Sequence, residues 1–300
     1  MEPIVSEPVR TGFFIAGAAK AGTSALHQLL EKHPSIAMSS VKEPNYFSWD
    51  LIEQQGLYYH AEDVRDHEDY EQLFRKGDGL LRGESSVSYL FYPQIAQRLF
   101  DYNPHAKIIV LLREPVARAQ SHYGMDHALG LIDISLEQVW KNGSGDPKTG
   151  LYFQQYFELG LYAKQLREYF TVFPKEQLLV LLHKDLREKR AETIEQLLRF
   201  LNLQPFPLIP DTQEVNTGMQ ARISLFAVLY KNRTFRSVAR KLLGNTLAYQ
   251  VKRVFFTRKK TGAYSIALQK EWQAFYKQDI ESLERLIGRS LESWKTMKAS

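Results

Sequence analysis

The chain has 300 residues, 44% of them apolar, and a formal net charge of +5 at neutral pH. This length and composition suit a protein with one large buried core. We expect no nucleic-acid partner. The sequence contains no Cys, which excludes disulfides and thiolate chemistry. No apolar run approaches the roughly 20 residues that span a bilayer, and the first residues lack the pattern of a signal peptide. We therefore expect a soluble, cytoplasmic protein.

The first predicted element is a buried strand over residues 13–15, followed by a loop and a helix that begins near Ala25. The loop reads Gly17-Ala18-Ala19-Lys20-Ala21-Gly22-Thr23-Ser24. Backbone N–H groups of such a loop, with the positive end of the next helix, bind anions. An ATP-binding P-loop has Lys directly after its second Gly, whereas this chain has Thr23 there. The pattern predicts a phosphate site that lacks the Lys used to bind a nucleoside triphosphate. The alternative interpretation is a turn of small residues that binds no ligand.

A second anion-binding segment follows the apolar run 107–112, which predicts another buried strand. The strand runs into Arg113, and Pro115 suits the first turn of the next helix, which carries Ser121. Arg113 should lie at the carboxyl edge of the sheet, where ligands of open α/β folds bind. A Walker-B strand would end in Asp to help hold magnesium. An Arg in that place predicts a bound anion instead.

Together these segments resemble the sulfotransferases that use 3′-phosphoadenosine 5′-phosphosulfate (PAPS). Residues 20–24 look like the 5′-phosphosulfate loop of that family, and residues 113–123 look like its 3′-phosphate motif. The segment Lys42-Glu43-Pro44-Asn45-Tyr46-Phe47 is similar to one in the heparan-sulfate-type branch. The resemblance runs from about Gly12 to Trp294 and favours a soluble enzyme of bacterial type.

The expected fold class is α/β, with a P-loop-like parallel sheet flanked by helices and a helical C-terminal extension. Apolar runs at residues 13–15, 107–112 and 178–182 alternate with helix-period segments, as in parallel βαβ units. We expect a single sulfotransferase domain over residues 1–300, with its α/β core at 11–205 and the mainly helical extension at 206–300. Between a Ser265 cap and a Gly288 stop, one helix of the extension should bury a set of apolar side chains: Leu268, Trp272, Phe275, Leu283 and Ile287.

The resemblance implies the reaction and the role of each matching residue. The chain would transfer a sulfuryl group from PAPS to an acceptor hydroxyl without a metal ion. Glu43 matches the catalytic base, and Lys20 matches the residue that neutralises charge on the leaving oxygen. Lys42 and His127 are expected on the acceptor side. The expected donor-binding residues are Lys20, Ala21, Gly22, Thr23, Ser24, Arg113, Ser121, Asn216 and Gly218.

The acceptor is the least defined part of this hypothesis. Relatives that act on heparan sulfate often have His two residues and Asp five residues after the catalytic Glu, where this chain has Asn45 and Ser48. We expect a glycan or glycolipid acceptor, with a small metabolite as the alternative. Residues 231–260 contain ten basic residues and no acidic one, which would attract an anionic acceptor or a membrane surface. A solvated helical face is the plain alternative.

Two other functions fit parts of the sequence. A kinase with a degenerate P-loop is disfavoured by Thr23 in the place of Lys and by Arg113 at the end of its strand. A nucleotide-binding protein without activity is disfavoured by the presence of both Lys20 and Glu43. His122 lies within the 3′-phosphate motif, and we interpret it as a packing or surface residue.

Overall fold

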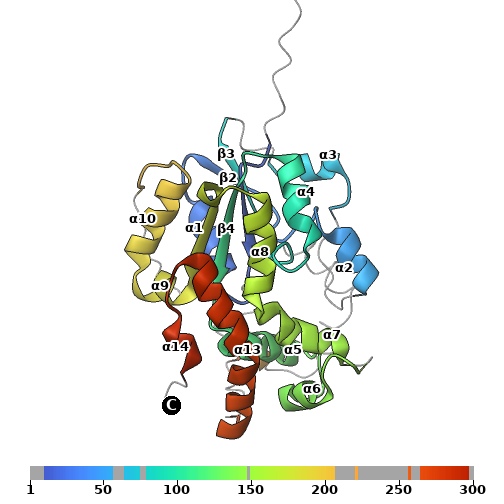
Figure 1. The fold of residues 1–300 in the computed structure, drawn as a ribbon. Coiled ribbons are helices and arrows are strands. Elements are labelled where there is room, and N and C mark those ends of the chain that lie inside the picture. The colour runs from blue at the N-terminus through green and yellow to red at the C-terminus, as the bar shows by residue number, and fades with distance from the viewer. Residues whose placement is uncertain are drawn as a thin grey trace, which may run out of the picture. The chain divides into compact units, whose positions relative to one another are not determined.

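Figure 1 shows the computed structural model, which describes residues 10–56, 64–74, 79–146, 149–206, 220–221, 256–257 and 264–296. Contacts within the chain divide it into two units. The first unit comprises residues 1–113, 162–209 and 282–289, and the second comprises residues 114–161, 210–281 and 290–300.

The first unit is built on a five-stranded sheet in the order β2-β3-β1-β4-β5, and every neighbouring pair is parallel. The central strands β1 and β4 are apolar almost throughout and buried on both faces, as is usual for parallel sheets. The strands are β1 (Phe13–Gly17), β2 (Ile36–Met38), β3 (Leu81–Ser85), β4 (Lys107–Leu112) and β5 (Leu178–Leu182). The predicted parallel α/β sheet is confirmed.

Strand β3 ends in two polar residues, Glu84 and Ser85, and both are fully buried. The strand also explains Gly83, because a Cβ built there would stand 2.1 Å from the Phe13 ring of the neighbouring β1. The close approach of these two strands therefore requires glycine at this position.

Helices cover the sheet of the first unit. Helix α1 packs against β1, β2 and β3 through Leu26, Leu29 and Leu30, which recur at helical spacing and are buried. Helices α9 and α10 contact β5, while α4 and α8 lie side by side (Figure 1). The elements are α1 (Thr23–Glu31), α2 (Trp49–Gln55), α3 (His67–Gln72), α4 (Gln94–Tyr102), α8 (Tyr162–Val172), the 3-10 turn η2 (Lys175–Gln177), α9 (His183–Glu188) and α10 (Arg190–Phe200).

The second unit is mainly helical. It includes α5 (Pro115–Ala128), α6 (Leu136–Asn142), α7 (Gly150–Tyr156), the 3-10 turn η1 (Glu158–Gly160), a short antiparallel pair β6 (Gln220–Ala221) and β7 (Phe256–Thr257), and α14 (Glu292–Lys295). Helix α13 (Ile266–Ile287) belongs to this unit up to Glu281. Within the described part of the chain, no helix is both long and apolar enough to span a membrane.

Helix α13 confirms the helix predicted for the C-terminal extension. Ser265 Oγ accepts from Leu268 N at 3.2 Å, which is an N-terminal cap, and Gly288 follows the last turn with a φ of 64°. Leu268, Trp272 and Leu283 are buried, while Phe275 and Ile287 are half-buried. The predicted apolar face is therefore real, although it is not buried over its whole length.

Candidate functional site

The loop of residues 17–24, called the anion loop below, joins β1 to α1 at the carboxyl edge of the sheet. Gly22 is the N-cap of α1 with a φ of 102°, and no side chain caps the helix. A Cβ on Gly22 would stand 3.1 Å from Cδ2 of His183, so both the backbone angle and the space favour glycine. Lys20 also has a positive φ, 65°. A helix N-terminus without a capping side chain is suited to an anion.

Arg113 connects the anion loop to the end of β4. Its Nη1 donates to the carbonyl oxygen of Lys20 at 3.2 Å, and its own carbonyl accepts from Tyr162 OH at 2.9 Å. The fold thus brings Lys20, Gly22 and Arg113 to one edge of the sheet, since β1 and β4 are parallel neighbours. Among the other predicted loop residues, Ala21 and Thr23 are buried and Ser24 is half-buried.

His183 lies beside this loop and was missed by the sequence interpretation. It is the first residue of α9 and directly follows β5, so it stands at the same carboxyl edge. Burial, together with the charges of Arg113 and Arg187, lowers the pKa of His183 to about 4. The ring is therefore neutral at physiological pH. Its position after the third apolar run was the signal that could have found it.

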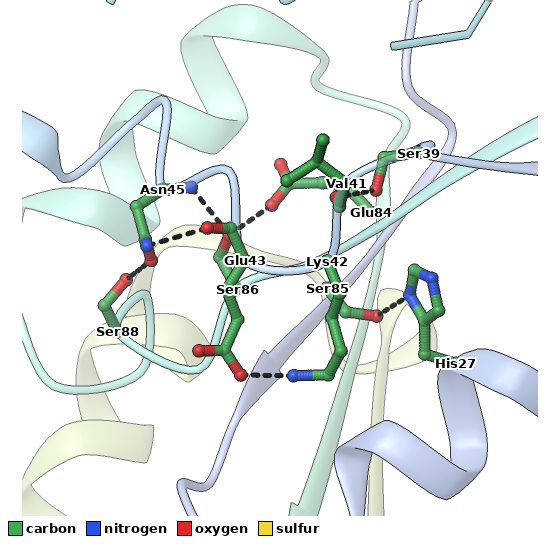
Figure 2. Close-up of polar contacts among 10 residues, drawn as sticks. All are labelled: His27, Ser39, Val41, Lys42, Glu43, Asn45, Glu84, Ser85, Ser86 and Ser88. Atoms are coloured by element: carbon green, nitrogen blue, oxygen red, sulfur yellow. Dashed lines mark hydrogen bonds and ion pairs between the residues drawn. The ribbon is translucent and has the colours of Figure 1, made fainter. Parts of the chain in front are cut away.

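Glu43 lies in a turn between β2 and α2, and residues 43–47 are called the Glu43 turn below. Its backbone N donates to the carbonyl of Ser85, the last residue of β3, at 2.8 Å. Its carboxylate forms an ion pair with Lys42, which is drawn in Figure 2. The Glu43 and Lys42 side chains are 40% and 24% exposed, so the pair is accessible to a ligand. A carboxylate held open beside a cation can accept a proton from a neighbouring hydroxyl.

His27 is a second histidine that the sequence interpretation missed. It lies on α1, is buried, and its Nδ1 is 3.0 Å from Ser85 Oγ (Figure 2). Burial, and to a lesser extent the charge of Lys42, lowers its pKa to about 4, while the charge of Glu43 opposes the fall. His27 is therefore neutral and adds no charge beside the Lys42–Glu43 pair. Its only sequence signal was its place one turn after the anion loop.

The remaining predicted residues do not all fall within the described part of the chain. Ser121 and His127 lie on α5 in the second unit, where Ser121 is half-buried and His127 is exposed. Asn216 and Gly218 lie outside the described residues, as does nearly all of the basic segment 231–260.

Two residues of the 3′-phosphate motif have internal roles. Arg118 is fully buried, and its Nη2 donates to the carbonyls of Gln155 and Tyr156 at 2.9 and 2.5 Å. His122 is also buried, with Nδ1 3.0 Å from the Gln155 carbonyl, which confirms its interpretation as a packing residue. These contacts hold α5 to α7 within the second unit.

Within the described ranges, no group of three or more His, Cys, Asp or Glu side chains is arranged to hold a metal ion. The side chains described beside the anion loop are cationic or neutral, namely Lys20, Arg113 and His183. Such an edge attracts an anion more readily than a cation.

Comparison with known proteins identifies the class to which this fold and site belong. The family model for the sulfotransferase domain matches residues 10–286, so the chain belongs to that family. The solved structure of a sulfotransferase from Alicyclobacillus acidocaldarius is 27% identical, with a TM-score of 0.70 over 96% of this chain and 100% of that one. The predicted family and fold are therefore confirmed.

Two curated relatives are enzymes named for carbohydrate substrates. Carbohydrate sulfotransferase 15 of Mus musculus is 29% identical over 252 residues, covering 64% of this chain and 44% of the relative. Bifunctional heparan sulfate N-deacetylase/N-sulfotransferase 2 of Bos taurus is 29% identical over 198 residues, covering 65% of this chain and 22% of the relative. The chain thus spans less than half the length of either relative.

Proposed function

We propose that the chain is an O-sulfotransferase that moves a sulfuryl group from PAPS to an acceptor hydroxyl. The observation that carries the proposal is the hydrogen bond from Arg113 to the Lys20 carbonyl, which joins two anion-binding segments at the edge where α1 begins. A donor with a phosphate at each end of its nucleoside needs two such sites. Membership in the sulfotransferase domain family supports sulfuryl transfer as the reaction.

The donor site in this proposal combines the two segments. Residues 20–24 hold the 5′-phosphosulfate through backbone N–H groups and the positive end of α1. Arg113 holds the 3′-phosphate, for which a guanidinium offers paired donors. Ser121, Asn216 and Gly218 keep their proposed place in the donor site on the resemblance alone.

The transfer step assigns one task to each of two charged side chains. Glu43 takes the proton from the acceptor hydroxyl, and the acceptor oxygen attacks sulfur as the bond from sulfur to the phosphate oxygen breaks. Lys20 neutralises the negative charge that grows on that leaving oxygen. Lys42, which is paired with Glu43, is assigned to the acceptor side. His127 is assigned to that side on the resemblance alone. In this scheme the ammonium of Lys20 replaces the metal ion of phosphoryl transferases.

For the acceptor we propose a hydroxyl on a glycan or a glycolipid. The names of the two curated relatives support a carbohydrate in general terms. The basic segment 231–260 would favour an anionic glycan or a membrane-borne one. A small metabolite is the second choice.

The test is a transfer assay with ³⁵S-labelled PAPS in the presence of a metal chelator. The acceptor panel contains desulfated heparin oligosaccharides, a neutral glycolipid and a simple phenol. We expect labelled product from at least one carbohydrate acceptor, and a rate lower by about 10²-fold or more when Glu43 is replaced by Gln. Failure to label any acceptor, together with phosphoryl transfer from magnesium-ATP, would contradict the proposal.

A further inference from the structure

The Glu43 turn has an unusual backbone. The φ angles of Glu43 and Asn45 are 62° and 53°, both in the left-handed region that residues other than glycine seldom adopt. Asn tolerates this region better than most residues, but Glu has no such preference. Asn45 Nδ2 donates to the Glu43 carbonyl at 2.9 Å, which closes the turn on itself. Such a conformation persists only where the surroundings hold it.

Side chains that follow β3 hold the turn from outside. Asn45 N donates to Ser86 Oγ at 3.1 Å, and Phe47 N donates to Tyr89 OH at 3.3 Å. Ser88 Oγ donates to Asn45 Oδ1 at 2.6 Å, as Figure 2 shows. Two backbone N–H groups of the Glu43 turn therefore end on hydroxyl oxygens, whose lone pairs must face the turn.

One buried carboxyl, Glu84, orients both of these hydroxyl groups. Ser86 Oγ donates to Glu84 Oε1 at 2.5 Å, and Tyr89 OH donates to Glu84 Oε2 at 3.0 Å. Glu84 has no exposed surface. An ionised carboxylate only accepts hydrogen bonds. It therefore accepts hydrogen bonds from the hydroxyl groups of Ser86 and Tyr89. The lone pairs of these hydroxyl groups are then free to accept from the N–H groups of Asn45 and Phe47.

We propose that Glu84 is a positioning residue for Glu43, acting through Ser86 and Tyr89 to hold the turn that presents the Glu43 carboxylate. The proposal rests on the proposed function, in which Glu43 is the base. Glu84 itself is fully buried. Among the described residues, its hydrogen-bond donors are Ser86, Tyr89 and Tyr70, the last of which donates to Oε2 at 3.1 Å.

Ionisation of Glu84 matters to this arrangement. Burial raises the pKa of Glu84 to about 7, although the hydrogen bonds from Ser86, Tyr89 and Tyr70 oppose the rise. A protonated Glu84 would have to donate to one of its three neighbours and reverse that bond. A neutral apolar residue would fill the same space without the cost of burying a carboxyl group, so packing alone does not account for Glu84.

A matched pair of variants separates positioning from general stability. Tyr89→Phe and Tyr70→Phe each remove one phenol bond to the same carboxylate oxygen, and both side chains are fully buried. The hydroxyl of Tyr89 also accepts a hydrogen bond from the Glu43 turn, whereas the hydroxyl of Tyr70 pairs with Thr11 at 3.0 Å. Tyr70 touches the turn through its ring, which stacks on Tyr46 at 4.4 Å between centroids and which Phe retains. A purely structural role for Glu84 would make the two variants alike.

The measurement is amide hydrogen exchange by NMR, which needs no acceptor. We expect Tyr89→Phe and Ser86→Ala to speed exchange of the Asn45 or Phe47 amide by about tenfold or more, and Tyr70→Phe to leave both within threefold of the wild type. With the most active acceptor of the panel above, kcat should fall about tenfold in Tyr89→Phe and Ser86→Ala. Their affinity for 3′-phosphoadenosine 5′-phosphate should stay unchanged.

Two failures are distinguishable. If Tyr89→Phe and Tyr70→Phe show equal exchange and equal kcat while Glu43→Gln is inactive, the role of Glu84 is overturned and the proposed function stands. If Glu43→Gln keeps wild-type turnover, Glu43 is not the base and the proposed function is wrong at that residue. The positioning role of Glu84 in catalysis then fails with it, whatever the exchange rates are.

Discussion

The anion loop and the Glu43 turn lie at the same edge of one sheet, yet different interactions hold them. The anion loop is a run of consecutive residues fixed by its flanking strand and helix. Gly22 lies where the loop backbone comes close to the His183 ring. The Glu43 turn is fixed by partners about 40 residues later in the chain, as in the contact from Asn45 to Ser86. One region depends on backbone geometry, the other on buried side chains.

This difference suggests how each region tolerates change. The anion-binding groups of the loop are main-chain N–H groups, which most substitutions leave in place. The position of Glu43 instead depends on hydroxyl groups whose orientation is set by a buried carboxyl. We therefore expect substitutions near Glu43 to affect turnover while donor binding survives. In the loop we expect most substitutions to be tolerated, and only a change of a side chain that acts on the donor, such as Lys20, to affect both binding and turnover.

Replacing Glu43 with Gln should have the largest effect. We expect turnover to fall by about 10²–10⁴-fold, the usual contribution of a positioned base, because Gln cannot accept the acceptor proton. Affinity for 3′-phosphoadenosine 5′-phosphate, measured by calorimetry, should be nearly unchanged. Near-normal turnover would show that Glu43 is a bystander.

Lys20→Ala is the matching change in the anion loop. It should lower turnover by about 10²-fold or more, because the charge on the leaving oxygen is no longer neutralised. Unlike the Glu43 change, it should also weaken the binding of 3′-phosphoadenosine 5′-phosphate. Unaltered donor affinity in both variants would erase the distinction between the two regions.

The buried Glu84 predicts a pH dependence of stability. Its pKa is about 7 in the folded chain against an ordinary value of 4.5, so the folded state retains a proton that the unfolded state has lost. Its contribution is most favourable below pH 4.5 and is lost as the pH rises to about 7. At about 1.4 kcal/mol per pKa unit, the loss is roughly 3 kcal/mol.

Urea unfolding of the wild type and of Glu84→Gln, measured across this pH range, isolates the contribution of Glu84 ionisation to the free energy of unfolding. The free-energy advantage of the wild type over the variant should shrink as the pH rises from 4.5 to 8. A difference that stays constant with pH would show that Glu84 does not titrate there. The loss at neutral pH is consistent with a residue kept for positioning rather than for stability.

Arg113→Ala should weaken the binding of 3′-phosphoadenosine 5′-phosphate by about 1.5–3 kcal/mol, the range for hydrogen bonds to a charged group. It should hardly change the affinity for adenosine 5′-phosphate, which lacks the second phosphate. Calorimetry with both nucleotides in the presence of chelator makes the comparison. Equal losses for the two would place Arg113 at the 5′ end, with the anion loop.

Much of the fold could be predicted because its strands are short apolar runs. Residues 107–112 and 178–182 form β4 and β5 with the predicted bounds, and β1 extends its predicted run by two residues to Gly17. The order of strands could not be read, since a parallel connection does not specify which strand becomes the neighbour. The cap and stop of α13 are local signals, and both were found.

The candidate site likewise has one part that could be predicted from the strands and one part that could not. The meeting of Lys20 with Arg113 follows from two parallel strands that end at one edge. The network from Glu84 to Asn45 could not be predicted, because its hydrogen bonds join segments far apart in the chain and obey no periodicity. His183 had a positional signal only, and nothing in the sequence marked it as neutral.

His183 gives the smallest expected effect and the sharpest test of the loop. Because its pKa is about 4, it meets a bound nucleotide as a neutral ring. We expect His183→Ala to weaken the binding of 3′-phosphoadenosine 5′-phosphate by about 0.5–1.5 kcal/mol, the range for a neutral hydrogen bond. His183→Gln, which keeps a neutral donor, should recover most of the lost binding free energy. Contacts of a neutral group are little screened by salt, so the loss measured by calorimetry at pH 7.5 should be equal at low and high ionic strength. A loss that shrinks steeply as salt is added would mean that His183 carries a charge in the complex.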